Sequence, residues 1–227
     1  MEKPNVEELM EDFLQKYPAK TYKKAEIIVF QGEAPRTAYV IKMGIVKAYN
    51  LNANGDEKPV AFYADYDVFP RSWAYGIMPS AIYYYEAFSD TIEVYLVPRE
   101  DYLNFIKSTP AVMYRELEHY VTDQIGKTMR LNALQHSRSS DKLIYTLHYL
   151  ALSHGRKINP KLVEITLTLT HQDFANLTGL TRETAATELN KLKSHGVIAY
   201  GKHTPYQIRL DKLTAMLNDE YIADIKL

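Results

Sequence analysis

Cysteine is absent from the 227-residue sequence, and several kinds of chemistry are absent with it. Without thiols the chain can form no disulfide, no cysteine nucleophile, no cysteine-ligated zinc site and no cysteine-held iron–sulfur cluster. Long apolar runs are lacking too, since no stretch reaches the roughly eighteen residues of a transmembrane helix. The N-terminal segment is acidic rather than a basic leader followed by an apolar stretch, so we expect a cytoplasmic protein with no membrane partner.

Catalytic patterns are missing as well. The seven histidines are scattered without metal-ligand spacing, and the sequence has neither a glycine-rich phosphate loop nor a nucleophile elbow. No pair of carboxylates is singled out. We therefore predict no enzyme, no catalytic residue, no metal and no cofactor, while an unidentified small-molecule effector stays open.

The charge is nearly balanced, but it is unevenly distributed. A net charge of −1 argues against a general nucleic-acid coat protein. From Arg138 onward, however, 12 Lys and Arg face 9 Asp and Glu, against 15 and 19 in the preceding part. The C-terminal part is therefore the better suited to phosphate, although its excess is small.

Short β-branched and aromatic runs fill residues 21–97. Turn signals at Gly32, Gly44 and 52–55 separate the runs, a regular punctuation typical of a small all-β roll or barrel. A short amphipathic helix over 6–17, closed by Pro18, is expected before them. The expected strands are 26–30, 38–41, 45–49, 59–63 and 91–97.

Helical patterns take over after Pro98. A long helix should run from Pro110 to about Ser137, with apolar residues every three or four positions. It would be about 40 Å long, more than a small barrel can bury, so we expect its apolar stripe to pair with the same helix of a second chain. Packing on its own domain is the alternative. The candidate dimer residues are Met113, Leu117, Tyr120, Val121, Ile125, Thr128 and Leu131.

A polar stretch over 137–141 predicts a hinge, and 142–154 predicts another amphipathic helix that stops at Gly155.

The window 169–192 then predicts a helix-turn-helix. Thr170, followed three residues later by Asp173, indicates a capped helix start, and Gly179 can take the positive φ of a tight turn. Thr181 would cap the second helix, which can enter the major groove of DNA.

Helical geometry divides that second helix into two faces. Ala185, Leu189 and Leu192 gather on one side at 100° per residue, with polar residues opposite. Arg182 can reach guanine O6 and N7, and Glu183 can accept from cytosine N4. The alternative is an ordinary polar helix start. The candidate DNA-binding residues are Thr170, His171, Gln172, Thr181, Arg182, Glu183, Thr184, Thr187, Asn190, Lys191 and Lys202.

A two-stranded hairpin over 197–210 should follow as a wing. Lys202 and His203 stand at its tip, where positive charge would meet the DNA backbone. A lysine at the tip is equally what any solvated turn presents, so both interpretations stay open.

These segments resemble the Crp/Fnr family of bacterial regulators, which join a cyclic-nucleotide-binding-type β-roll, a long dimerisation helix and a winged helix-turn-helix. The resemblance covers nearly the whole chain and rests on 29–33, 38–47 and the window 170–192, in which 181–184 match the Ser-Arg-Glu-Thr motif of the family. It implies that Arg182 and Glu183 read bases. The further arginine of the cyclic-AMP-type motif falls at Thr187, so the target sequence should differ.

The resemblance implies an α+β fold with a β-roll sensor domain over 1–109, a dimerisation helix over 110–137 and a winged helix-turn-helix domain over 138–227. It further implies a homodimer on an inverted-repeat site in double-stranded DNA, with RNA polymerase as a further candidate partner. A winged helix that contacts protein instead of DNA is the alternative; a salt-sensitive, sequence-selective gel shift would separate the two.

The sensor domain departs from the family pattern. Pro70-Arg71 stands where cyclic-AMP-binding members have Gly-Glu, and Ala81-Ile82 stands where they have Arg-Ser. The cyclic phosphate would lack its guanidinium partner, so we predict no binding of cyclic AMP in the usual way. Aromatic residues fill this segment instead, which leaves an anionic or flat ligand and a packed, ligand-free core as alternatives, with haem a weaker one. The candidate effector-pocket residues are Phe62, Arg71, Trp73, Tyr83 and Tyr85.

Overall fold

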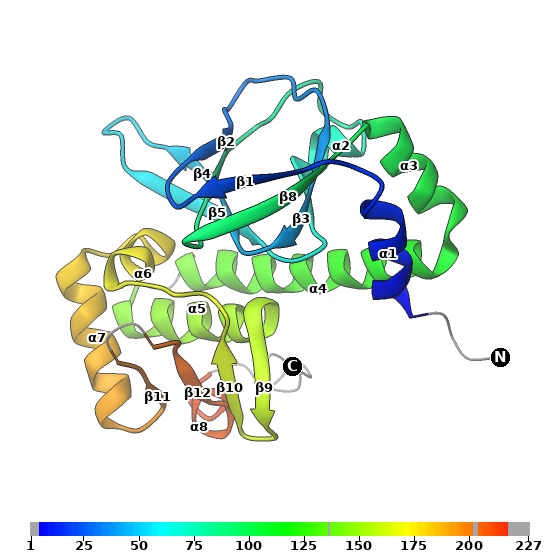
Figure 1. The fold of residues 1–227 in the computed structure, drawn as a ribbon. Coiled ribbons are helices and arrows are strands. Elements are labelled where there is room, and N and C mark those ends of the chain that lie inside the picture. Colours follow the sequence, from blue (N-terminus) through cyan, green and yellow to red (C-terminus); the bar gives the residue numbers. More distant parts are fainter. Residues whose placement is uncertain (1–4, 136, 202–203, 218–227) are drawn as a thin grey trace. The chain divides into compact units, whose positions relative to one another are not determined.

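The structure, a computed structural model, describes residues 5–135, 137–201 and 204–217 (Figure 1). The chain divides into two compact units, one up to Glu118 and one from His119 onward. The helix α4 (Pro110–Gln135) contributes to both, so the boundary falls inside this helix rather than at either of its ends.

Two four-stranded antiparallel sheets form the N-terminal unit, which confirms the predicted roll. Their strand orders are β1-β8-β3-β6 and β2-β7-β4-β5. The sequence did not predict β1, β6 or β7. The strands are β1 (Ala19–Lys23), β2 (Ile27–Val29), β3 (Ala38–Met43), β4 (Val46–Leu51), β5 (Glu57–Tyr63), β6 (Val68–Phe69), β7 (Tyr84–Ala87) and β8 (Thr91–Val97).

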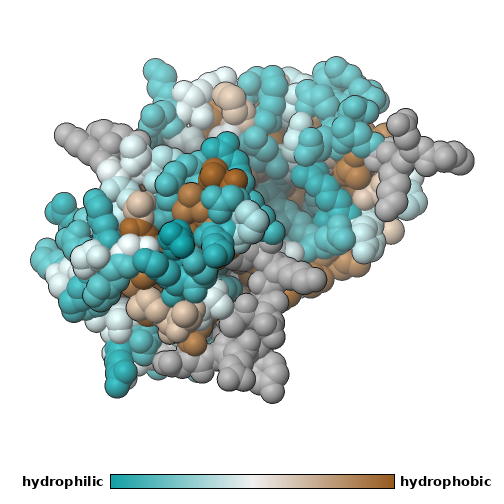
Figure 2. All heavy atoms as spheres, turned by 90° about the horizontal axis from the view of Figure 1, so that it is seen from below, coloured by the Kyte–Doolittle hydropathy of each residue, from teal (hydrophilic) through white to brown (hydrophobic). Residues whose placement is uncertain are grey.

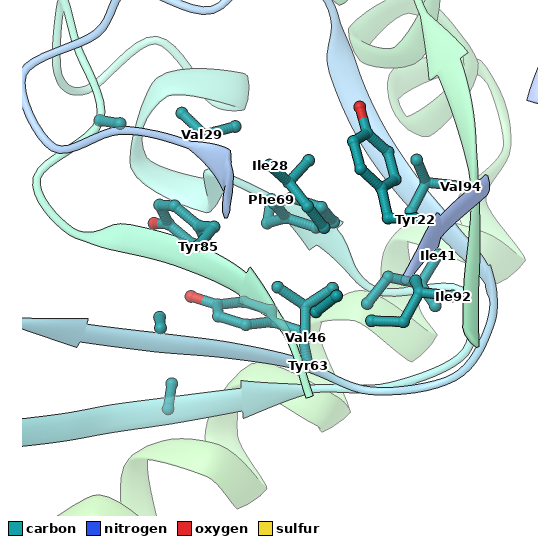
Figure 3. Packing of buried hydrophobic residues seen from close by; sticks show 14 residues of the cluster. Tyr22, Ile28, Val29, Ile41, Val46, Tyr63, Phe69, Tyr85, Ile92 and Val94 are labelled. Carbon is teal, nitrogen blue, oxygen red and sulfur yellow. The ribbon is translucent and has the colours of Figure 1, made fainter. Parts of the chain in front are cut away.

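Side-chain alternation along the strands builds the core between the two sheets. In β3, Ile41 points into this core while Val40 points to the opposite face, as expected from a period of two. Tyr22, Tyr63, Phe69 and Tyr85 are the buried aromatic residues of this core (Figure 3). The molecular face drawn in Figure 2 is mostly hydrophilic, with hydrophobic residues in separate patches.

The outer face of the first sheet is covered by helices. A second buried cluster lies on this face. Its fully buried members include Met10 and Leu14 of α1 (Val6–Leu14) and Tyr102 of α3 (Arg99–Ser108). Phe13 and Phe105 stack with ring centroids 4.0 Å apart, which joins α1 to α3. The expected first helix is thus present, but it ends at Leu14 rather than at 17. The short helix α2 (Arg71–Ala74) lies in the segment between β6 and β7.

The C-terminal unit combines the rest of α4 with further helices and a sheet. The predicted hinge is shorter than expected, because α5 begins at Ser139 rather than 142. Gly155 ends α5 as predicted, but its φ of −96° is not left-handed and it starts a strand. The elements are α5 (Ser139–His154), β9 (Gly155–Asn159), β10 (Leu162–Ile165), α6 (His171–Thr178), α7 (Arg182–Ser194), β11 (Ile198–Ala199), β12 (Gln207–Arg209) and α8 (Leu210–Thr214).

The wing is part of a larger sheet than the sequence predicted. Strands β11 and β12 pair antiparallel as expected, but β12 also pairs with β10, giving the order β11-β12-β10-β9. The two-stranded prediction was therefore incomplete, because all five residues of β9 are exposed and its sequence has no hydrophobic alternation.

Candidate nucleic-acid interface

The first helix of the predicted helix-turn-helix is fixed by its N-terminal cap. Thr170 Oγ1 accepts a hydrogen bond from the backbone N of Asp173 at 3.2 Å, and Asp173 Oδ2 accepts from the backbone N of Thr170 at 2.7 Å. This reciprocal pair is a capping box, which satisfies two backbone donors at once. Phe174 and Leu177 then face the interior. The predicted start of this helix is confirmed.

A tight turn at Gly179 separates α6 from α7. Gly179 has φ 68° and ψ 20°, a left-handed conformation that favours glycine, and its N–H donates to the carbonyl of Ala175. Thr181 follows as the cap of α7, since its Oγ1 accepts from the backbone N of Thr184 at 3.2 Å. The predicted glycine turn and second cap are therefore confirmed.

The second helix has the two faces that its sequence predicted. Ala185 and Leu189 are fully buried and Leu192 is nearly so. Glu183 and Asn190 lie on the opposite, exposed face. This arrangement leaves one polar side of α7 free for a partner while the other holds the helix to α5 and α6.

Some polar side chains of α7 already have partners within the helix. Arg182 is exposed in the first turn. Thr187 Oγ1 donates to the carbonyl of Glu183 at 2.9 Å, and Lys191 Nζ lies 2.8 Å from a carboxylate oxygen of Glu188. Surface pairs of this kind are weak, so they would yield readily to a stronger partner.

The other candidates surround this face. His171 and Gln172 start α6, where Gln172 Nε2 donates to Asn176 Oδ1 at 2.9 Å. Thr184 is half-buried in the first turn of α7. Lys202, expected at the tip of the wing, lies outside the described residues, as does His203.

A groove between α6, α7 and the wing brings several of these residues together. His171, Arg182, Lys193 and Tyr200 are among its lining residues. Burial and the neighbouring Arg182 lower the pKa of His171 below its usual 6.5, so the imidazole is mostly neutral at pH 7. The positive charge of the groove therefore comes from Arg182 and Lys193.

Two further residues of this groove, Lys193 and Tyr200, are not among the residues predicted from the sequence. Lys193 Nζ donates to the carbonyl of Tyr200 at 2.8 Å, and Tyr200 OH donates to Asn190 Oδ1 at 2.9 Å. The signal in the sequence is an aromatic residue directly before Gly201.

The candidate effector-pocket residues are divided between different surroundings. Tyr85 is 1% exposed and stacks on Phe69 with centroids 5.4 Å apart, inside the core between the sheets (Figure 3). Tyr83 packs against the same core from its edge. Phe62 packs on Phe88, 5.1 Å between centroids, whereas Trp73 belongs to the second cluster under the guanidinium of Arg99.

Arg71 is already engaged within the protein. Its Nη2 donates to Asp67 Oδ1 at 2.7 Å, and its guanidinium lies 5.4 Å from the ring centroid of Tyr63. An incoming anion would have to compete with the carboxylate of Asp67. The structure therefore brings Arg71, Tyr83 and Tyr85 to one core, and leaves Phe62 and Trp73 elsewhere.

The helix α4 carries an exposed apolar stripe at the predicted positions. Leu131 is 61% exposed and Leu117 is 56% exposed, while the opposite face buries Val112, Met129 and Ala133. All seven candidate dimer residues are exposed: Met113, Leu117, Tyr120, Val121, Ile125, Thr128 and Leu131. Exposed apolar surface of this extent on one helix is typical of an interface.

A glycine within α4 allows α5 to approach closely. A Cβ atom added to Gly126 would lie 2.6 Å from Ser153 Oγ and 2.9 Å from Cδ2 of Tyr149. Gly126 is thus a contact point between the two helices rather than a break in α4, and the stripe continues past it.

Among the described residues, each helix is too short or too polar to span a bilayer. Nor does the described part of the chain contain a cluster of three or more histidine and acidic residues that could hold a metal ion.

Comparison with known proteins gives matches over both units. Residues 19–109 match the family model of a cyclic nucleotide-binding domain, and residues 141–216 match a Crp-like helix-turn-helix domain. The regulatory protein HlyX of Actinobacillus pleuropneumoniae is 25% identical over 86% of this chain and 80% of its own length. The global nitrogen regulator of Synechocystis is 26% identical over 81% of each chain.

Solved structures with the same fold span nearly the full length. FixK2 from Bradyrhizobium japonicum is 21% identical with a TM-score of 0.69, covering 88% of this chain and 96% of its own. A CooA mutant from Carboxydothermus hydrogenoformans is 20% identical with a TM-score of 0.70, covering 95% and 96%. At these identities the likeness concerns the fold.

Proposed function

Because the chain belongs to the Crp/Fnr family of DNA-binding transcription regulators, we propose that it binds an inverted-repeat site as a homodimer, with α7 in the major groove of each half-site. The observation that carries this proposal is the exposed polar face of α7, with Arg182 in its first turn and Leu189 anchoring the opposite side. A twofold dimer would place two such helices about one turn of DNA apart. A DNA partner also implies a cytoplasmic location.

Selection of bound sequences from a random DNA pool tests the proposal directly. The full-length protein, without added effector, should enrich a palindrome. Failure of a folded, dimeric protein to enrich any sequence would contradict DNA reading in the absence of an effector.

Arg182 is proposed to read a base. Arg182→Ala should weaken binding to the selected site by about 1–3 kcal/mol and relax the preference at one base pair, with little change on random DNA. Arg156→Ala is the matched control, because Arg156 is an exposed arginine of β9 whose partner is Glu164. Equal losses of Arg182→Ala on selected and random DNA would contradict a base-reading role.

The homodimer is proposed to form along the stripe of α4. Ile125→Glu would place a charge in apolar surface that a second copy must desolvate, so the dimer should dissociate at micromolar concentration. Sedimentation measures this. Ile158→Glu is the control, since Ile158 is a comparably exposed isoleucine of β9. A dimer unaffected by Ile125→Glu would place the interface elsewhere.

The β-roll is proposed not to bind cyclic AMP. What supports this is the lack of the arginine at Ala81-Ile82, the ion pair of Arg71 with Asp67, and the ring of Tyr85 in the core. Calorimetric titration should detect no binding, and micromolar or tighter affinity would contradict the proposal.

Regulation of transcription implies RNA polymerase as a further partner, which transcription in vitro with purified polymerase would test.

A further inference from the structure

Tyr200 lies where the wing meets the recognition helix α7. Its hydroxyl donates to Asn190 Oδ1 at 2.9 Å, and its carbonyl accepts from Lys193 Nζ at 2.8 Å. The same ammonium group lies 4.4 Å from the centroid of the Tyr200 ring. One residue of the wing therefore contacts α7 at two positions less than one turn apart.

The ring of Tyr200 is held in place by further aromatic contacts. It stacks on Tyr206 with centroids 4.5 Å apart, and His171 of α6 meets its edge at 5.7 Å. Phe174 packs on Tyr206 in turn, 4.9 Å between centroids. Because these contacts come from both helices of the helix-turn-helix and from the wing, the hydroxyl has a fixed position.

The hydroxyl decides how Asn190 presents its amide. The hydroxyl donates to Asn190 Oδ1, and partial burial raises the pKa of Tyr200, so this proton stays in place at pH 7. The carbonyl oxygen of Asn190 is thereby turned toward Tyr200, and its NH2 group, a donor only, is left for solvent or a partner. Asn190 itself is exposed on the outward face of α7.

We propose that Tyr200 is a positioning residue for DNA recognition, which holds Asn190 so that its NH2 group donates to an acceptor on DNA. This inference rests on the proposed function. Guanine O6 and N7, thymine O4 and phosphate oxygens are acceptors of this kind. Bidentate recognition of adenine requires the asparagine oxygen as well as the nitrogen, and that oxygen is engaged by Tyr200.

A double-mutant cycle on the full-length protein tests the coupling. Tyr200→Phe keeps the ring and removes only the hydroxyl, and should weaken binding to the selected site roughly 3- to 10-fold. In an Asn190→Ala background the same change should cost nothing further, since the residue that it positions is gone. Tyr17→Phe, which removes a hydroxyl that donates to Asp101 in the N-terminal unit, is the matched control and should leave affinity unchanged.

The readouts separate the alternatives. A relaxed preference at one base pair in each half-site identifies a base acceptor, whereas equal weakening on all sequences identifies a phosphate; either result, with coupling, supports the proposal. Losses that simply add in the double variant would overturn it while leaving the proposed function intact. If the wild-type protein enriched no sequence, the proposed function and this inference would both be overturned.

Discussion

Tyr85→Ala would test whether the core between the two sheets of the β-roll is filled by the protein's own side chains, without a bound ligand. The change removes one of the buried rings of this core. Tyr85 is 1% exposed and contacts Phe69 and Tyr63, with centroids 5.4 and 5.9 Å away. Removal of a buried aromatic ring costs about 3–5 kcal/mol, because the cavity left behind collapses only in part. For a unit of this size, we expect the melting temperature to fall by roughly 10–25 °C.

The protein carries its own probe for this measurement. Trp73 is the only tryptophan in the sequence, and it is buried in the N-terminal unit. Thermal unfolding followed by tryptophan fluorescence therefore reports on the unit that contains Tyr85. Tyr84→Ala is the control, because Tyr84 is the half-buried neighbour on the other face of β7 and should cost only about 1 kcal/mol.

A small phenol provides the decisive second arm. p-Cresol has the shape of the lost side chain, and an engineered apolar cavity can accept such a molecule. At ten times its Kd it should restore about 1.4 kcal/mol to Tyr85→Ala and nothing to the wild type. Two results would refute the idea that side chains fill this core. One is a melting temperature of Tyr85→Ala no lower than that of Tyr84→Ala, and the other is equal stabilisation of Tyr85→Ala and the wild type by cresol.

Three further predictions concern the C-terminal unit. Gly179→Ala should lower stability by about 1–2 kcal/mol in urea titration, because the positive φ is strained although the added Cβ would meet no atom within 4 Å; an unchanged midpoint would contradict this. Gly126→Ala should lower the free energy of unfolding by about 1–3 kcal/mol in the same assay, because the added Cβ would clash with Tyr149. An unchanged free energy of unfolding would mean that α4 and α5 can move apart to make room for it. Burial lowers the pKa of His154 to about 4, below its usual 6.5. Between these two values the unfolded chain binds more protons than the folded protein, so the free energy of unfolding should fall as the pH drops from 6.5 toward 4. His154→Gln should flatten that dependence, and an identical pH profile for variant and wild type would contradict the assignment.

The sequence was most informative where a local rule decides the structure. The cap at Thr170, the turn at Gly179 and the two faces of α7 follow from short-range hydrogen bonding and helical periodicity. Strand β7 was missed because three consecutive tyrosines at 83–85 hide the alternation between its faces. For the same reason Tyr85, a core residue, was grouped with the candidate pocket.

Other features depend on segments that only the fold brings together. The hydrogen bond from Tyr200 to Asn190 joins a strand end to a helix, and neither residue signals the other in the sequence. The ion pair of Arg71 with Asp67 joins residues only four apart in the chain, but strand β6 lies between them and Arg71 begins α2, so helical spacing does not predict this pair. Propensity and periodicity contain no information on such pairings.

The position of β12 in the C-terminal sheet has a consequence for the order in which the protein is made. Val163 of β10 pairs with Ile208 of β12, and the whole helix-turn-helix lies between them in the chain. A ribosome that has just added Ser194 has thus completed α7 but not β12, the strand that connects the wing to β10. Until β12 is made, both β10 and β11 lack the strand that pairs with them. A message truncated in this interval would therefore encode a helix-turn-helix whose supporting sheet is incomplete.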